Sequence, residues 1–204
     1  MENTTMNIRA AATAALTLTS LLVLAGCPGA TTSGSSMPGM DHGSSSATPA
    51  QSADANEADV IFATMMIEHH TQAIEMSDIL LAKIGIDERV TVLVEQIKAA
   101  HQPEIAQMKG WLEDWGASTP DTGSMEHGGG MMSEGDMQSL KQATGTDAAR
   151  LFLQQTIQHH RGAIEMAQEE TGSGKNSDAV ALANQIVESQ TSETAAMEEL
   201  LAAL

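Results

Sequence analysis

An internal repeat constrains the fold of this chain more than any other feature. The stretch MIEHHTQAIEM (Met66–Met76) returns 90 positions later as TIQHHRGAIEM (Thr156–Met166). Each copy sets two adjacent histidines in a run whose apolar residues recur with the 3.6-residue period of an amphipathic helix. A repeated unit of this size cannot bury its apolar face alone, so we expect the two copies to pack against each other.

The repeat extends beyond the histidine pairs. Phe62 corresponds to Phe152, and a second pair of segments aligns, IKAAHQPEIAQM (97–108) with IVESQTSETAAM (186–197). These two segments share Ile, Glu and Met at matching positions. The repeated unit is therefore a helical hairpin rather than one helix.

Periodicity and capping residues place four helices, at about residues 56–84, 88–115, 148–172 and 178–204. The short connections GID and GSGKNS make each half an antiparallel hairpin, 54–116 and 147–204, joined by a Met/His-rich linker at 117–146. Only 2% of the residues are aromatic, so Ala, Leu, Ile, Val and Met must fill the core. The sequence predicts an all-α four-helix bundle with pseudo-twofold symmetry.

The N-terminal 53 residues have the composition of an export signal and a tether. Arg9 precedes an acid-free apolar run that ends in LAGC, and residues 1–27 resemble a bacterial lipoprotein signal peptide. That resemblance implies cleavage before Cys27, lipidation of its sulfur, and a mature protein anchored outside the cytoplasmic membrane. An uncleaved membrane anchor is the alternative. Residues 28–53 are rich in Ser and Gly, include two Met, and predict a flexible tether.

Charge and composition narrow the range of partners. A formal net charge of −18 excludes a general affinity for nucleic acid, which needs clustered cationic side chains. Fourteen Met and seven His supply the thioether and imidazole ligands that suit copper, although another divalent transition metal also fits. Cys27 is the only cysteine, so a metal site in the folded part must use other ligands.

A helical projection points both histidines of each pair toward the bundle interior, and Glu68 and Glu75 away from it. The same projection points His101, Glu104 and Glu193 inward. Buried imidazoles and carboxylates need partners, because an unpaired buried polar group costs a few kcal/mol, on the order of 1–3. Two interpretations satisfy this: a metal-free core of His–Glu hydrogen bonds, or a metal centre. The candidate metal ligands are His69, His70, His101, Glu104, His159, His160, Glu193, Met66, Met76 and Met166.

Helix geometry limits how these candidates combine. Met76 lies about 10 Å along the helix axis from His69, too far for one shared ion, whereas Met66 is within one turn of both His69 and His70. Pro103 removes a hydrogen bond from the second helix, so we expect a kink near it. Two further Met/His clusters, at 37–43 and 118–137, are either accessory Cu(I) sites or plain linker sequence.

The two HHxxAIEM cores, the preceding Phe, the segment QPEIAQMKGWL and the signal peptide resemble domain-of-unknown-function (DUF) family 305. This is a group of exported bacterial proteins assigned to the ferritin-like superfamily. The resemblance implies a ferritin-like helical bundle and, from some members, copper binding or copper tolerance. It carries over to His69, His70, His159 and His160, and to Met66, Met76 and Met166. The second copy departs from the pattern at Thr156, where the first has Met66, so the two halves need not bind metal equally.

A ferritin-like ancestry also raises the possibility of a di-iron enzyme. That chemistry uses Glu-x-x-His motifs, and none occurs in this chain. We therefore expect an extracytoplasmic lipoprotein that binds a transition metal, copper first, as a buffer or carrier and without catalysis. The alternative is a non-metal structural or interaction module with a hydrogen-bonded His/Glu core. The sequence leaves the oligomeric state open.

Overall fold

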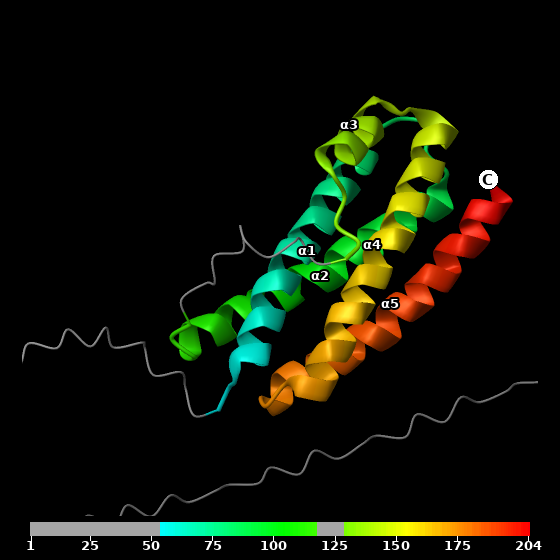
Figure 1. Cartoon of the computed structure of the whole chain (residues 1–204). Helices are drawn as coiled ribbons and strands as arrows, with labels where there is room; N and C mark the ends of the chain where they lie inside the picture. Colours follow the sequence, from blue (N-terminus) through cyan, green and yellow to red (C-terminus); the bar gives the residue numbers. More distant parts are fainter. Residues whose placement is uncertain (1–53, 118–128) are drawn as a thin grey trace, which may run out of the picture. The chain divides into compact units, whose positions relative to one another are not determined.

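The computed structural model describes residues 54–117 and 129–204. These residues form five α-helices and no strand: α1 (Glu57–Leu81), α2 (Glu88–Asp114), α3 (Glu134–Gln142), α4 (Gly145–Ser173) and α5 (Ser177–Ala203) (Figure 1). The long helices α1 and α2 form one hairpin and α4 and α5 the other. The prediction of an all-α bundle is confirmed.

Local signals set most of the helix ends. Asn56 and Asp59 form a reciprocal capping box at the start of α1, and Asp87 caps α2 as the sequence indicated. The end of α1 was predicted too late. This helix stops at Leu81, and Ile84, which the predicted helix of residues 56–84 included, is 91% exposed in the turn that leads to Gly85 at φ +74°.

The short helix α3 was not predicted and lies inside the segment assigned to the linker. Ser133 and Asp136 form its capping box, and its buried residues Met137 and Leu140 join the bundle core with Met132. Nine residues with two inward apolar positions give too weak a periodic signal for prediction. Met132 and Met137 belong to the Met/His cluster for which both an accessory Cu(I) site and plain linker sequence were considered, and both pack in the apolar core.

The bundle interior consists of two apolar clusters with a polar layer between them. One cluster gathers around Phe152, Met76 and Leu80, and the other around Phe62 and Met66. Along α1, His69 and His70 lie between these two groups of residues. The pseudo-twofold relation exchanges the clusters, because Phe62 and Phe152 occupy corresponding positions of the repeat.

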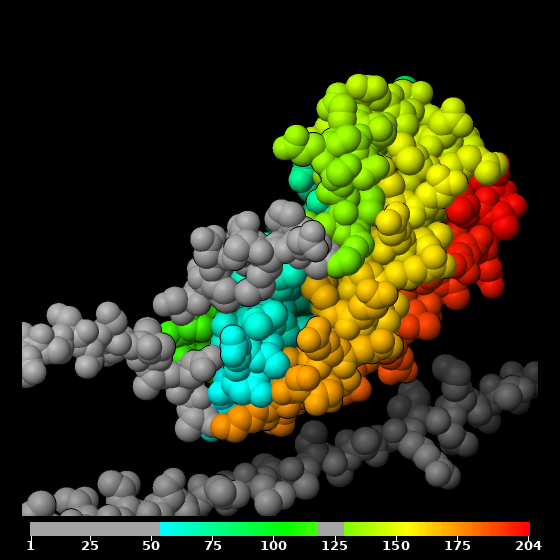
Figure 2. Space-filling model, viewed as in Figure 1, coloured from blue at the N-terminus to red at the C-terminus, as the bar shows by residue number. Residues whose placement is uncertain are grey.

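Within residues 54–117 and 129–204, helix α3 covers one of the two pseudo-equivalent ends of the seam between α1 and α4. Figure 2 shows the segment from Gly129 through α3 lying over this seam. The amide of Gln72 in α1 pairs with both main-chain groups of Met132, and Lys141 pairs with Glu75. The opposite end of the seam keeps a groove of about 460 Å³. It is lined by Glu57, Ala58, Ile61, Phe62, Met65, Gly129, Gly162, Glu165, Met166, Glu169 and Glu170.

Helix α2 continues through Pro103 from Glu88 to Asp114, so the proline does not end it; the expected kink stays a prediction. None of the helices formed by residues 54–117 and 129–204 is long and apolar enough to cross a membrane. The signal peptide with Cys27, the tether, and the linker residues Met125 and His127 lie outside the described residues.

Candidate metal centre

Five histidines from three helices form the polar layer of the bundle. Each has at most 2% of its surface exposed: His69 and His70 on α1, His101 on α2, and His159 and His160 on α4. Adjacent histidines diverge by about 100° around a helix axis, yet both members of each pair are buried. The inward orientation predicted from the sequence is confirmed for all five.

The first members of the two pairs meet across the seam between α1 and α4. The ring centroids of His69 and His159 lie 3.6 Å apart with the planes tilted by 37°. Burial, and then the nearby His70 and His160, lower the pKa of His69 to about 3. Burial also lowers the pKa of His159 well below its ordinary value, with His69 as the next cause. Both rings are therefore neutral at pH 7.

The second member of each pair contacts a carboxylate of its own hairpin. Nε2 of His70 lies 2.7 Å from Oε2 of Glu104, and Nε2 of His160 lies 2.8 Å from Oε2 of Glu193. An ionised carboxylate only accepts hydrogen bonds, so in such a pair Nε2–H donates, and the remaining ring nitrogen, Nδ1, is the atom that can offer a lone pair to a metal ion. A carboxylate in this position orients an imidazole and increases its strength as a ligand. The structure thus makes Glu104 and Glu193 histidine partners as well as candidate ligands.

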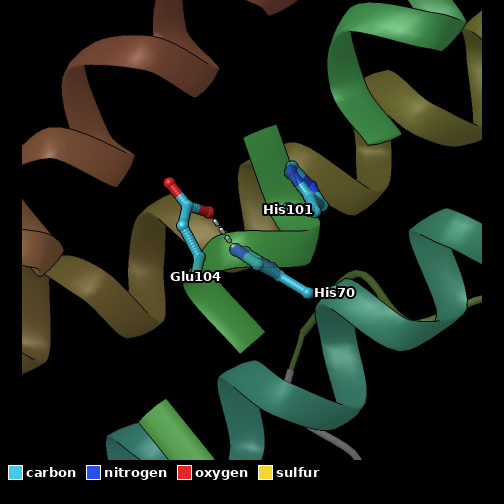
Figure 3. A group of neighbouring side chains, drawn as sticks. All are labelled: His70, His101 and Glu104. Carbon is cyan, nitrogen blue, oxygen red and sulfur yellow. Dashed lines mark hydrogen bonds and ion pairs between the residues drawn. The ribbon is translucent and has the colours of Figure 1, made fainter. Parts of the chain in front are cut away.

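His101 places a second imidazole beside His70 and Glu104 (Figure 3). The two rings stack with centroids 4.0 Å apart, and His101 lies 5.9 Å from the ring of His160. Burial lowers the pKa of His101 well below 6.5, with His70 the next cause. His70, His101 and Glu104 each offer a ligand atom within 4.8 Å of the others. Among the described residues, no other group of three His, Cys, Asp or Glu meets that criterion.

The described residues supply few hydrogen bonds to this layer. Of the ten ring nitrogens of the five histidines, the two Nε2 atoms that contact carboxylates are paired, and the other eight have no partner at normal hydrogen-bond geometry among the described residues. Each unpaired buried group costs about 1–3 kcal/mol. Neutral, buried imidazoles with free lone pairs are the state that binds Cu, Zn, Ni or Fe. The donor set fits a transition metal ion, and imidazole outnumbers carboxylate in it.

The predicted methionine ligands lie among apolar side chains. Met66 belongs to the apolar cluster around Phe62, and Met76 to the one around Phe152. Met166 lines the open groove together with Met65, which the sequence did not single out. Both Met66 and Met76 are buried, and burial by itself fits packing as well as metal binding.

A buried carboxyl group outside the histidine layer was also missed. Glu170 on α4 is 1% exposed, and its carboxyl group lies beside that of Asp59 on α1. Burial and the neighbouring Asp59 raise its pKa to about 8. Its counterpart in the first copy of the repeat is Leu80, so the repeat pattern predicts an apolar residue at this position.

The fold and the site define an all-α bundle with a histidine-rich polar layer in its interior. The family model for DUF305, a domain of unknown function, matches residues 59–201, and the chain belongs to this family. A comparison with curated proteins finds no match.

Solved structures of the same fold support this assignment. A DUF305 protein from Streptomyces coelicolor is 35% identical at a TM-score of 0.66, covering 71% of this chain and 92% of that one. A DUF305 fragment from Deinococcus radiodurans is 28% identical at a TM-score of 0.65, covering 74% and 99%. CopM in its Cu(II)-bound form is 29% identical at a TM-score of 0.61, covering 71% and 95%.

Proposed function

We propose that this protein binds copper ions in the histidine layer of its bundle and acts as an extracytoplasmic copper buffer or carrier, without catalysis. The observation that carries the proposal is the set of eight unpaired ring nitrogens on five buried histidines. A buried layer of this kind destabilises a metal-free protein, and a bound ion provides the missing partners. In this role copper is cargo, taken up and released.

The similarity to CopM supports copper over other transition metals. CopM is 27% identical to this chain in its Cu(I)-bound form and 26% in a silver-bound form, each at a TM-score of 0.58. Ag(I) has the charge and ligand preferences of Cu(I). Imidazole binds both oxidation states of copper, and the 14 methionines of the chain add soft ligands suited to Cu(I).

Metal titration of the full chain at pH 7 tests the proposal. A ligand that binds only the folded state at 100 times its Kd raises the unfolding free energy by about 2.7 kcal/mol. We expect Cu(II), and Cu(I) under reducing conditions, to raise the melting temperature more than Zn(II) or Fe(II). Replacing both His70 and His160 by Gln should remove most of the copper effect.

A matched double substitution on the same two helices that leaves every histidine in place serves as the control. Glu75→Gln with Glu165→Gln changes exposed, repeat-equivalent positions on the same two helices and should leave the copper effect intact. If copper does not stabilise the parent protein, or stabilises the His70/His160 variant equally, the histidine layer is not its binding site. The structural or interaction module then becomes the better reading.

The proposed location outside the cytoplasm rests on the signal sequence and on one relative. The Streptomyces coelicolor protein is described as a predicted secreted protein. Fractionation of cells that produce the full chain should place it in the membrane fraction through the lipid on Cys27. Cys27→Ser should prevent processing to the lipid-bearing form, and an unchanged mature mass would refute the lipoprotein assignment.

A further inference from the structure

The pseudo-twofold symmetry of the bundle repeats the carboxylate–histidine pair, but it does not repeat the second imidazole that lies beside this pair in the first hairpin. His70–Glu104 in the first hairpin has its counterpart in His160–Glu193, with contacts of 2.7 and 2.8 Å. His101, three positions before Glu104, corresponds to Gln190, three positions before Glu193. The second hairpin therefore has an amide where the first has an imidazole.

Gln190 occupies a true counterpart of the His101 position. Gln190 is 1% exposed and His101 is 2% exposed, so both side chains lie inside the bundle. The Oε1 atom of Gln190 and both ring nitrogens of His101 lack hydrogen-bond partners. The difference between the two half-sites is thus in ligand chemistry rather than in burial.

An amide is a much weaker ligand for copper than an imidazole. The amide nitrogen has no available lone pair, and its oxygen is a hard, neutral donor that suits Mg²⁺ or Ca²⁺ better than copper. His101 is grouped with the first hairpin. Its ring stacks on that of His70 with centroids 4.0 Å apart, and His70, His101 and Glu104 offer ligand atoms within 4.8 Å of one another, whereas the ring centroid of His160 lies 5.9 Å away. The half-site of His160 and Glu193 is left one imidazole short.

We infer that copper binding at the carboxylate–histidine pairs is confined to the first hairpin, and that Gln190 is the residue that keeps the second hairpin from forming an equivalent site. This inference rests on the proposed function, since it concerns how many ions the layer takes and where. The inference does not depend on the other mismatch between the two copies, Met66 against Thr156, because Met66 packs in an apolar cluster. The repeat encodes two half-sites, and one side chain leaves only one of them complete.

Four proteins test the inference by Cu(II) stoichiometry: the parent chain, Gln190→His, His101→Gln, and the double exchange of both. All four carry His42→Asn and His127→Asn, so that imidazoles outside the bundle do not contribute. Bound Cu(II) is counted at pH 7 by equilibrium dialysis and electron paramagnetic resonance. Far-UV circular dichroism confirms that each variant is folded.

We expect Gln190→His to bind one Cu(II) more than the parent and His101→Gln to bind one fewer. The double exchange should restore the parent count with an unchanged histidine content. An unaltered count in folded Gln190→His, or in folded His101→Gln, overturns the inference. If Gln190→His does not fold, the His101→Gln count still decides, because a second site in the parent would leave Cu(II) bound to His160. A parent chain that binds no Cu(II) refutes the proposed function itself, a result distinct from either failure.

Discussion

Acidification of the metal-free protein from pH 7 to pH 5 should reveal the cost of burying neutral histidines. Burial lowers the pKa of His69 to about 3, whereas in the unfolded chain it returns to about 6.5. Below pH 6.5 the unfolded state takes up a proton that the folded state does not. Above pH 6.5 the low pKa of His69 therefore does not reduce the free energy of unfolding, and this free energy falls as the pH decreases from 6.5 toward 3. Between pH 7 and pH 5, linkage gives a loss of about 2 kcal/mol from this one residue.

Other buried groups also change the unfolding free energy between pH 7 and pH 5, and the direction of each change follows from its pKa shift. His101 and His159, whose pKa values are also lowered by burial, add to the loss on acidification. Glu170 acts in the opposite direction, because its pKa is raised to about 8 and the folded state holds its proton across this range. The pH dependence of the parent protein alone is a mixture, so a comparison with a variant is needed to isolate His69.

Urea denaturation followed by far-UV circular dichroism, with a chelator present, measures the unfolding free energy of the parent and of His69→Gln at each pH. The parent should lose about 2 kcal/mol more than His69→Gln between pH 7 and pH 5. Gln158→Ala alters an exposed, non-titrating side chain beside His159 and should behave as the parent. Equal pH dependence in the parent and His69→Gln would mean that folded His69 takes up the proton. The argument from buried neutral imidazoles would then fail.

Three further measurements test other parts of the structure. Glu170→Gln removes a carboxyl group that the folded state keeps protonated. The unfolding free energy of this variant relative to the parent should therefore be about 2 kcal/mol higher at pH 7 than at pH 5. A difference from the parent that does not change with pH would contradict the raised pKa. Leu140→Ala empties a fully buried position of α3 and should cost about 2–5 kcal/mol in urea denaturation, whereas a cost near zero would show that α3 does not pack on the bundle. Glu104→Ala leaves Nε2 of His70 unpaired, and we expect Cu(II) affinity to fall about 10- to 100-fold in a competition titration; unchanged affinity would remove the role of Glu104 in orienting the ring.

The sequence by itself determined the helical hairpins, their duplication and the faces that they bury. These follow from local physics: a 3.6-residue period fixes which side chains share a face, and residues such as Asp87 cap a helix through contacts a few positions away. Period alone also showed that both members of each histidine pair point inward. Period could not separate packing from chemistry: Met66 and Met76, candidate ligands through the resemblance to DUF305, lie in the apolar clusters.

Only the tertiary structure decided which inward residues meet. The contact of His69 with His159, the orientation of His70 by Glu104, and the distances from His101 to the two second histidines depend on how separate helices pack. No local pattern encodes that geometry. Helix α3 also depends on tertiary structure. Its nine residues have no strong helical period and are stabilised by the packing of Met137 and Leu140 on α1 and α4. Burial of Glu170 at a position that the repeat makes equivalent to Leu80 likewise follows from packing, because the exposure of a side chain depends on what the rest of the chain places over it.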